Sequence, residues 1–193
     1  MALTRLTSTA ISGTLPAANI NDTSISNITA LPAGVGGKVL QVVQGTSSTQ
    51  FFVSNINNNL RHYPTSNKLT VSITPSSASS KIIVNAIATV RVDKNAVTGD
   101  AGVALVIKQI ISGGATTELY PSTAAYSSGM YLGQNGASQV IRFRHNEIVY
   151  SSPATTNLIT YEVGVFAYAS SIQDIYLNDT SNRGEIIVYE VQG

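Results

Sequence analysis

Strict alternation of apolar and polar residues is the feature of this sequence that most restricts its fold. In the segment 81–92, KIIVNAIATVRV, every second residue is apolar, which places these side chains on one face of an extended strand. They are Ile82, Val84, Ala86, Ala88, Val90 and Val92. No segment of ten or more residues carries the 3.6-residue apolar stripe of an amphipathic helix. The chain is therefore predicted to be all-β.

Further segments share this strand-like pattern and are separated by turn residues such as Gly113-Gly114. One face holds Leu69, Val71 and Ile73 in the first segment, and Tyr161, Val163 and Val165 in the fifth. Regular turn spacing favours an antiparallel β-sandwich, jelly-roll-like, with roughly eight strands. The seven predicted strands are 69–74, 81–92, 101–111, 140–150, 158–168, 171–178 and 184–191.

Several of these strands are apolar on both faces. In the segment 184–191, Ile186 and Val188 lie on one face and Ile187 and Val191 on the other. An antiparallel strand that is apolar on both sides needs a second buried face. The pattern therefore predicts a subunit interface on the outside of the sandwich.

Residues 1–37 differ from the rest, so the chain is divided into an extended N-terminal arm, 1–37, and a sandwich domain, 38–193. Pro16, Pro32 and clustered glycines interrupt regular structure in the arm. Composition alone also fits a disordered tail. Isolated apolar residues recur every three to five positions, which favours an arm that attaches to another subunit. These anchoring residues are Leu3, Leu6, Ile11, Leu15, Ile20, Ile25, Ile28 and Leu31.

Charge and cysteine content restrict the partners. Only 11% of the 193 residues are charged, and the net charge is +1, so no field steers the protein to nucleic acid. The chain has no cysteine, which excludes disulfides and thiolate chemistry. No apolar segment approaches the roughly 20 residues of a membrane-spanning helix, and the N-terminus lacks a signal-peptide pattern. We expect no membrane insertion.

Catalytic and metal-binding patterns are absent from the sequence, so we expect a non-enzymatic protein without cofactor or metal. The two histidines, His62 and His145, fall in different segments, and no nucleotide-binding or hydrolase motif occurs. The segments 93–100 and 179–182 contain oxygen ligands, but both lack the distal glutamate of a calcium loop and are interpreted as turns. No pair of carboxylates is marked out for glycoside hydrolysis.

Four residues form a candidate ligand surface. Arg142 and Arg144 project from the same side of one strand and could bind an anionic sugar or phosphate. The alternative is a solvated face paired with Glu147 or Glu162. Tyr126 and Tyr131 could form a shallow surface on which a sugar stacks, although tyrosine is equally common in sandwich cores.

Three segments resemble structural proteins of tailed phages, in particular fibre and capsid decoration proteins. The first is LTVSITPSSASSKIIVNAIATVRV, with its ITPSS-x-SSK pattern between two strands, and the second is YSSPATTNLITYEVGVFAY. The third, SGTLPAANINDTSISNITALPAG followed by GKVLQVVQG, is similar to the connector that precedes this domain in fibre proteins. The resemblance implies a trimeric or otherwise oligomeric β-sandwich on the virion and supplies no catalytic residues. We expect a homotrimer.

The length of the arm indicates where in the virion the protein is located. Fully extended, 37 residues reach at most about 120 Å, which is short for a receptor-binding fibre. We therefore expect a capsid decoration protein on the phage particle surface, made in the host cytoplasm and bound to other virion proteins. The alternative is a short tail-fibre or adaptor knob that binds a receptor or polysaccharide of the host surface.

Overall fold

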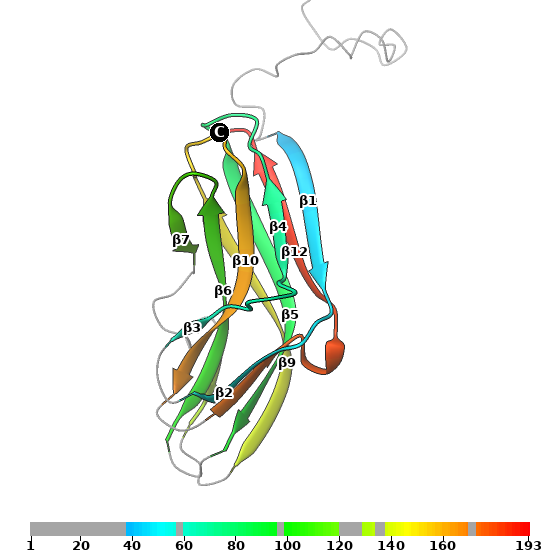
Figure 1. Ribbon diagram of the computed structural model, residues 1–193, viewed down its shortest axis with the longest axis vertical. Coiled ribbons are helices and arrows are strands. Elements are labelled where there is room, and N and C mark those ends of the chain that lie inside the picture. Colours follow the sequence, from blue (N-terminus) through cyan, green and yellow to red (C-terminus); the bar gives the residue numbers. More distant parts are fainter. Residues whose placement is uncertain (1–37, 57–59, 96–98, 120–128, 134–137, 170–172) are drawn as a thin grey trace, which may run out of the picture. The chain divides into compact units, whose positions relative to one another are not determined.

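The structure is a computed structural model, and it describes residues 38–56, 60–95, 99–119, 129–133, 138–169 and 173–193. The predicted arm, with all of its anchoring residues from Leu3 to Leu31, lies outside the described residues, as does Tyr126. The described part of the chain forms two antiparallel sheets packed face to face (Figure 1).

Sheet A is built around β5, its longest strand. One edge of β5 pairs with β12 through residues 81–87 and with β11 through residues 90–94, while β9 runs along the other edge. Beyond them, β1 pairs with β12 and β2 with β11. The strands are β1 (Val39–Ser47), β2 (Phe51–Ile56), β5 (Lys81–Lys94), β9 (Gln139–Ser151), β11 (Gln173–Leu177) and β12 (Gly184–Val191).

Sheet B is built around the antiparallel pair β6 and β10. Their register runs from Ala101 opposite Ala169 to Ile111 opposite Ile159. The outer edge of β10 pairs with β3 and β4, and β6 pairs with β7 and β8. The strands are β3 (Arg61–His62), β4 (Thr70–Ile73), β6 (Ala101–Ile111), β7 (Thr116–Leu119), β8 (Met130–Leu132) and β10 (Ile159–Ala169). Between β11 and β12 lies the short 3₁₀ turn η3 (Asp179–Ser181).

The core lies between the sheets and contains the apolar faces that the alternation predicts. All six apolar residues of the face of β5 are 0% exposed, and so are Tyr161, Val163 and Val165 of β10. The apolar residues of β4 are at most 7% exposed. At about 25 cal/mol per Å2, burial of this many branched side chains is the main source of stability.

The predicted fold class, an antiparallel β-sandwich, is confirmed, and every predicted strand is present. The strand number differs, because twelve strands are described rather than about eight. The five strands that were not predicted are β1, β2, β3, β7 and β8, of which the last three have only two to four residues. Segments this short are below the length over which alternation can be recognised.

Two glycines mark places where backbones approach too closely for a side chain. A Cβ on Gly45 of β1 would lie 1.9 Å from the carbonyl oxygen of Thr70 in β4, so this glycine lets the edges of the two sheets meet. A Cβ on Gly164 of β10 would lie 2.5 Å from the carbonyl oxygen of His62.

Within the described ranges, no helix is long and apolar enough to cross a membrane.

Candidate functional site

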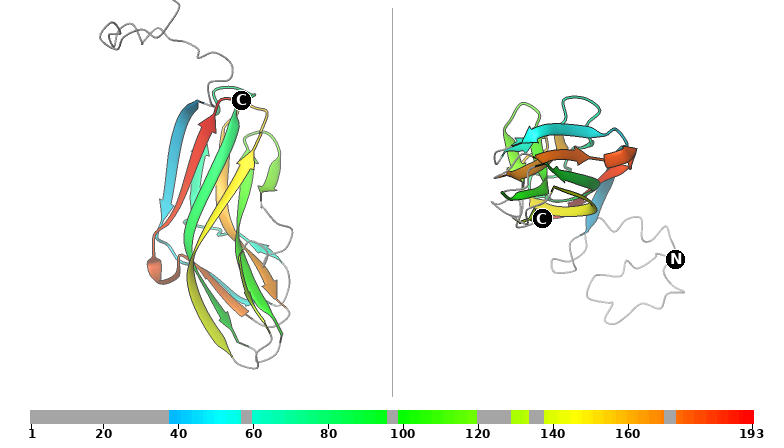
Figure 2. Two further views of the ribbon diagram at one scale, coloured as in Figure 1. Left: turned by 180° about the vertical axis from the view of Figure 1, so that it is seen from behind. Right: turned by 90° about the horizontal axis from the view of Figure 1, so that it is seen from below.

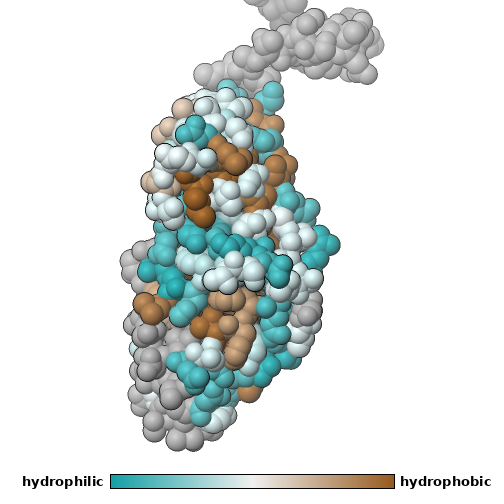
Figure 3. Space-filling view, in the orientation of Figure 1, coloured by the Kyte–Doolittle hydropathy of each residue, from teal (hydrophilic) through white to brown (hydrophobic). Residues whose placement is uncertain are grey.

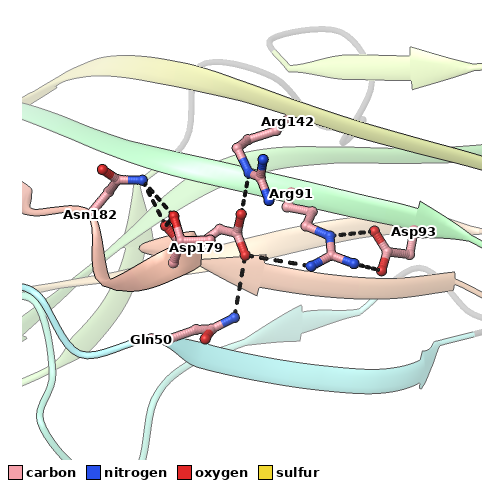
Figure 4. Close-up of polar contacts among 7 residues, drawn as sticks. Gln50, Arg91, Asp93, Arg142, Asp179 and Asn182 are labelled. Carbon is pink, nitrogen blue, oxygen red and sulfur yellow. Dashed lines mark hydrogen bonds and ion pairs between the residues drawn. The ribbon is translucent and has the colours of Figure 1, made fainter.

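A group of charged side chains lies at the start of η3 and on the outer face of sheet A (Figure 4). Asn178, which precedes the turn, has left-handed backbone angles (φ 55°, ψ 43°). Its side-chain amide donates to the carbonyl oxygens of Ser47 and Thr49, at 3.2 Å each. The segment after β11 is thereby held against the end of β1, and Asp179 is directed towards β5 and β9.

Asp179 is 1% exposed and accepts hydrogen bonds from two other segments. Its carboxylate accepts from Nε of Arg142 on β9 and from Nε2 of Gln50, the latter at 3.4 Å. Nη1 of Arg91 on β5 lies 3.8 Å from the same carboxylate. The side-chain amide of Asn182 donates to the Asp179 carbonyl oxygen at 2.8 Å and closes the turn.

Arg91 connects this group to two aromatic rings. Its Nε donates to Asp93 at 2.7 Å, and this hydrogen bond is the main cause of a raised pKa of the guanidinium. The guanidinium carbon lies 4.5 Å from the ring centre of Tyr176, and this ring also stacks on Phe52, with ring centres 4.6 Å apart. Arg91 is thus held by two interactions: an ion pair with the Asp93 carboxylate and a cation–π contact with the Tyr176 ring.

This arrangement is a closed network rather than an open anion site. The predicted ligand residue Arg142 is bound to Asp179, so its charge is already compensated. Arg144 projects on the same face two residues further along β9 and makes no ion pair with the described residues. The structure confirms that the two arginines share a face of β9. They differ in that Arg142 is paired with a carboxylate of the described residues and Arg144 is not.

The predicted alternative partners of these arginines are wrong. Glu147 has the opposite parity on β9, so it points inward, where it is 3.3 Å from Nε2 of His145. Glu162 belongs to sheet B and accepts from Lys68 and Lys108 at 3.1 and 3.2 Å. Because Glu162 is 1% exposed, two lysines compensate a charge that would otherwise be costly to bury.

Tyr131 lies on the outer face of sheet B, away from the arginines. It is 49% exposed, and its ring centre is 6.1 Å from that of Tyr168. Among the described members of the predicted ligand surface, Tyr131 and the two arginines therefore lie on opposite faces of the sandwich. Figure 3, which shows one face in the orientation of Figure 1, has a hydrophilic band across the middle of the domain, between more apolar areas.

The ITPSS segment has a structural role that sequence analysis missed. After Pro75, the chain turns over the buried carboxylate of Glu190 on β12. Glu190 accepts from the amide and hydroxyl of Ser76 at 2.7 Å each, from the hydroxyl of Ser80 at 2.6 Å and from Gln41 at 2.6 Å. Burial opposes ionisation, but these hydrogen bonds outweigh it and lower the pKa of Glu190 to about 2.

The arrangement of the described side chains does not support a metal site. Among the described residues, no group of three or more histidine or carboxylate side chains lies close enough to hold an ion. In the segment 179–182, the Asp179 carboxylate faces arginines rather than other oxygen ligands. The segment 93–100 includes residues outside the described ranges, so its interpretation as a turn stays a prediction.

The fold and this site define an antiparallel β-sandwich domain whose prominent polar groups hold strands together. No protein-family model matches the chain, and no curated protein is significantly similar in sequence. Two solved structures of infectious bursal disease virus, the VP2 subviral particle and the Gx strain, each match 78% of this chain at 14% identity, with TM-scores of 0.34 and 0.32. This chain spans 37% and 40% of those two chains. The likeness is too weak to carry an argument about function.

Proposed function

We propose that the chain is a non-enzymatic structural protein of a tailed-phage virion. Of the roles considered, we favour that of a homotrimeric capsid decoration protein on the particle surface. Residues 1–37 attach it to other virion proteins, and the sandwich forms the exposed part. The proposal starts from the resemblance of the three segments described above to phage fibre and decoration proteins.

The observation that carries an assembly role is the exposed apolar surface on the outside of sheet A. Val42, Ile148 and Tyr150 are 52%, 43% and 75% exposed, although the core between the sheets is complete without them. Contiguous exposed apolar side chains on a protein typically mark a surface that another protein covers. A subunit of a virion has such a surface because it functions only in an assembly.

Labelling of intact phage particles with gold-coupled antibody against residues 38–193 tests the location. Gold over the head is the expected result, and gold confined to the tail favours the fibre or adaptor knob. Particles that carry no label, when the antibody recognises the isolated protein, contradict a virion role. Deletion of residues 2–37 should abolish attachment and leave a folded sandwich with unchanged circular dichroism.

A receptor knob that binds a host polysaccharide is the second candidate. The observation that favours it is the half-exposed ring of Tyr131 beside Tyr168, because tyrosine pairs on a sheet face suit stacking with sugar rings. Arg144 lies on the opposite face of the sandwich and takes no part in this site. Binding to a glycan array that disappears in Tyr131→Ala would support this function. An array without signal would contradict it.

A further inference from the structure

Residues 60–68, which we call the strap, run from β3 across the domain to the start of β4 (Figure 1). In the view from behind, Figure 2 (left), the strands of sheet A are in front and the strap lies on the far side, with sheet B. The amide of Ala167 on β10 donates to the Leu60 carbonyl oxygen at 2.9 Å. Just beyond the other end of the strap, the amide of Val163 donates to the Leu69 carbonyl oxygen at 3.0 Å. The strap is therefore attached to β10 near both of its ends.

The strap covers two apolar side chains that are separate from the core between the sheets. Val106 of β6 is 0% exposed and Phe166 of β10 is 7% exposed, although their sequence neighbours are the residues that point into the core. The two form a cluster of their own, and Tyr63 of the strap and Tyr168 pack against it. On this stretch, the outer apolar face of β6 and β10 is thus buried by the chain itself.

Gly164 of β10 makes room for the strap. A Cβ at this position would lie 2.5 Å from the carbonyl oxygen of His62 and 2.5 Å from Cδ1 of Tyr63. Both atoms belong to the strap, and one of them is a backbone atom, so a larger residue would push the strap away from β10. A glycine inside a strand often marks such a close approach of another backbone.

Glu118 on β7 holds the strap from the opposite side of the cluster. Its Oε2 lies 2.9 Å from Nε of Arg61, and its Oε1 accepts from the Tyr63 hydroxyl at 3.3 Å. The Arg61 guanidinium carbon lies 4.4 Å from the ring centre of Phe166, so this side chain lies over the cluster. One carboxylate therefore binds both of the side chains with which the strap covers the cluster.

The buried Glu162 stays compensated when the strap leaves the sheet. Lys68, the last residue of the strap, lies 3.1 Å from the Glu162 carboxylate, and Lys108 of β6 lies 3.2 Å from the same oxygen. Lys108 is part of sheet B and keeps this contact without the strap. The large cost of an isolated buried charge therefore does not oppose opening.

We propose that the strap opens as a unit while the sandwich stays folded, and that Glu118 controls the opening. Opening breaks the two-residue pairing of β3, one backbone hydrogen bond near each end and the ion pairs of Arg61 and Lys68, all of them local. It exposes Val106 and Phe166 and leaves the core covered, because these two belong to a separate cluster. A segment with few and local contacts opens at a lower free energy than the whole domain.

Thiol labelling of the full-length chain tests the opening, because the sequence has no cysteine of its own. Val106→Cys places a thiol beneath the strap, and Val90→Cys places one in the core, where the valine is likewise 0% exposed. With excess dithionitrobenzoate under native conditions, Val106→Cys should react at least about 100-fold faster than Val90→Cys. Urea denaturation of each variant gives the rate expected from global unfolding alone. If both thiols react at that rate, the strap does not open separately and the proposal is overturned.

Glu118→Gln tests what controls the opening. It should raise the labelling rate of Val106→Cys about tenfold, because it weakens the charge-assisted contacts that hold the strap. The rate of Val90→Cys should stay unchanged. Glu185→Gln removes a carboxylate from the outer face of sheet A, is the matched control and should leave both rates as they are. An unchanged rate of Val106→Cys in Glu118→Gln would overturn the role of this carboxylate.

Gly164→Ala provides a second variant, which displaces the strap without changing a charge. It should also accelerate the labelling of Val106→Cys and leave that of Val90→Cys unchanged. Equal acceleration of both thiols would mean that the whole domain loosens, and it would contradict a strap that opens by itself. None of these outcomes depends on the virion role, which the gold labelling tests separately.

Discussion

Glu190, near the end of the last strand, accepts a 2.6 Å hydrogen bond from the hydroxyl of Ser80, the residue before β5. The two residues are 110 positions apart and both lie in the buried part of the domain. Ser76 and Gln41 complete the group, so the carboxylate joins β1, β12 and the turn before β5. This group makes the stability of the domain depend on pH.

Acid should destabilise the domain through Glu190. The folded state lowers the pKa of this residue from 4.5 to about 2, so its stabilising contribution is complete above pH 4.5 and is lost as pH falls towards 2. Between pH 6 and pH 3 the loss should be about 2 kcal/mol. Glu190→Gln should reduce stability at pH 6 and flatten this dependence, as measured by urea denaturation. Glu185→Gln is the control, and an equal slope in Glu190→Gln would contradict the assignment.

Arg142 and Arg144 should differ in their effects on stability, although they lie on the same face of β9. Arg142→Gln removes a partner of the buried Asp179 carboxylate and should lower the free energy of unfolding by about 1–2 kcal/mol. Arg144→Gln should change it by less than about 0.5 kcal/mol, as exposed surface substitutions do. Thermal unfolding in low salt measures both. Equal losses would show that Asp179 does not depend on Arg142.

Gly45→Ala should open the contact between β1 and β4. The new methyl group would lie 1.9 Å from the carbonyl oxygen of Thr70, so one of the two backbones must move. We expect a loss of about 1–3 kcal/mol, the range for overpacking. Gly133→Ala meets its nearest atom, in Tyr131, at 3.6 Å and should be nearly neutral in the same denaturation experiment. A stable Gly45→Ala variant would contradict the close approach.

Tyr161 should remain neutral in alkali for as long as the domain is folded. Burial raises its pKa to about 12, while the neighbouring Ser151 hydroxyl acts in the opposite direction. The Tyr161 hydroxyl donates to Gln109 at 3.1 Å. An acid whose pKa is raised on folding favours the folded state below pH 10, and this contribution is lost as pH rises through 10 towards 12. Tyr161→Phe should therefore weaken the alkaline loss of stability, followed by circular dichroism between pH 8 and pH 11. An unchanged alkaline profile would contradict this role.

Part of the candidate site was within reach of sequence analysis. Residues at even and odd positions of a strand point to opposite faces, so Glu147 could have been excluded as a partner of Arg142 from the spacing alone. Asp179 and Glu190 could not have been found in this way. Their partners lie on strands whose neighbours are set by the order of the sheet, and no local pattern records that order.

The sequence by itself determined the all-β class, the predicted strands and the inner face of those strands in which apolar and polar residues alternate. Apolar alternation is a local property, and every strand must bury its apolar face whatever its neighbours are. Tertiary structure decided which strands pair, and therefore which charges meet. It brought Arg142 to Asp179, Glu162 to two lysines, and Val42, Tyr189, Ile83 and Tyr150 into one row. These contacts join residues far apart in the chain, because they depend on the register between strands.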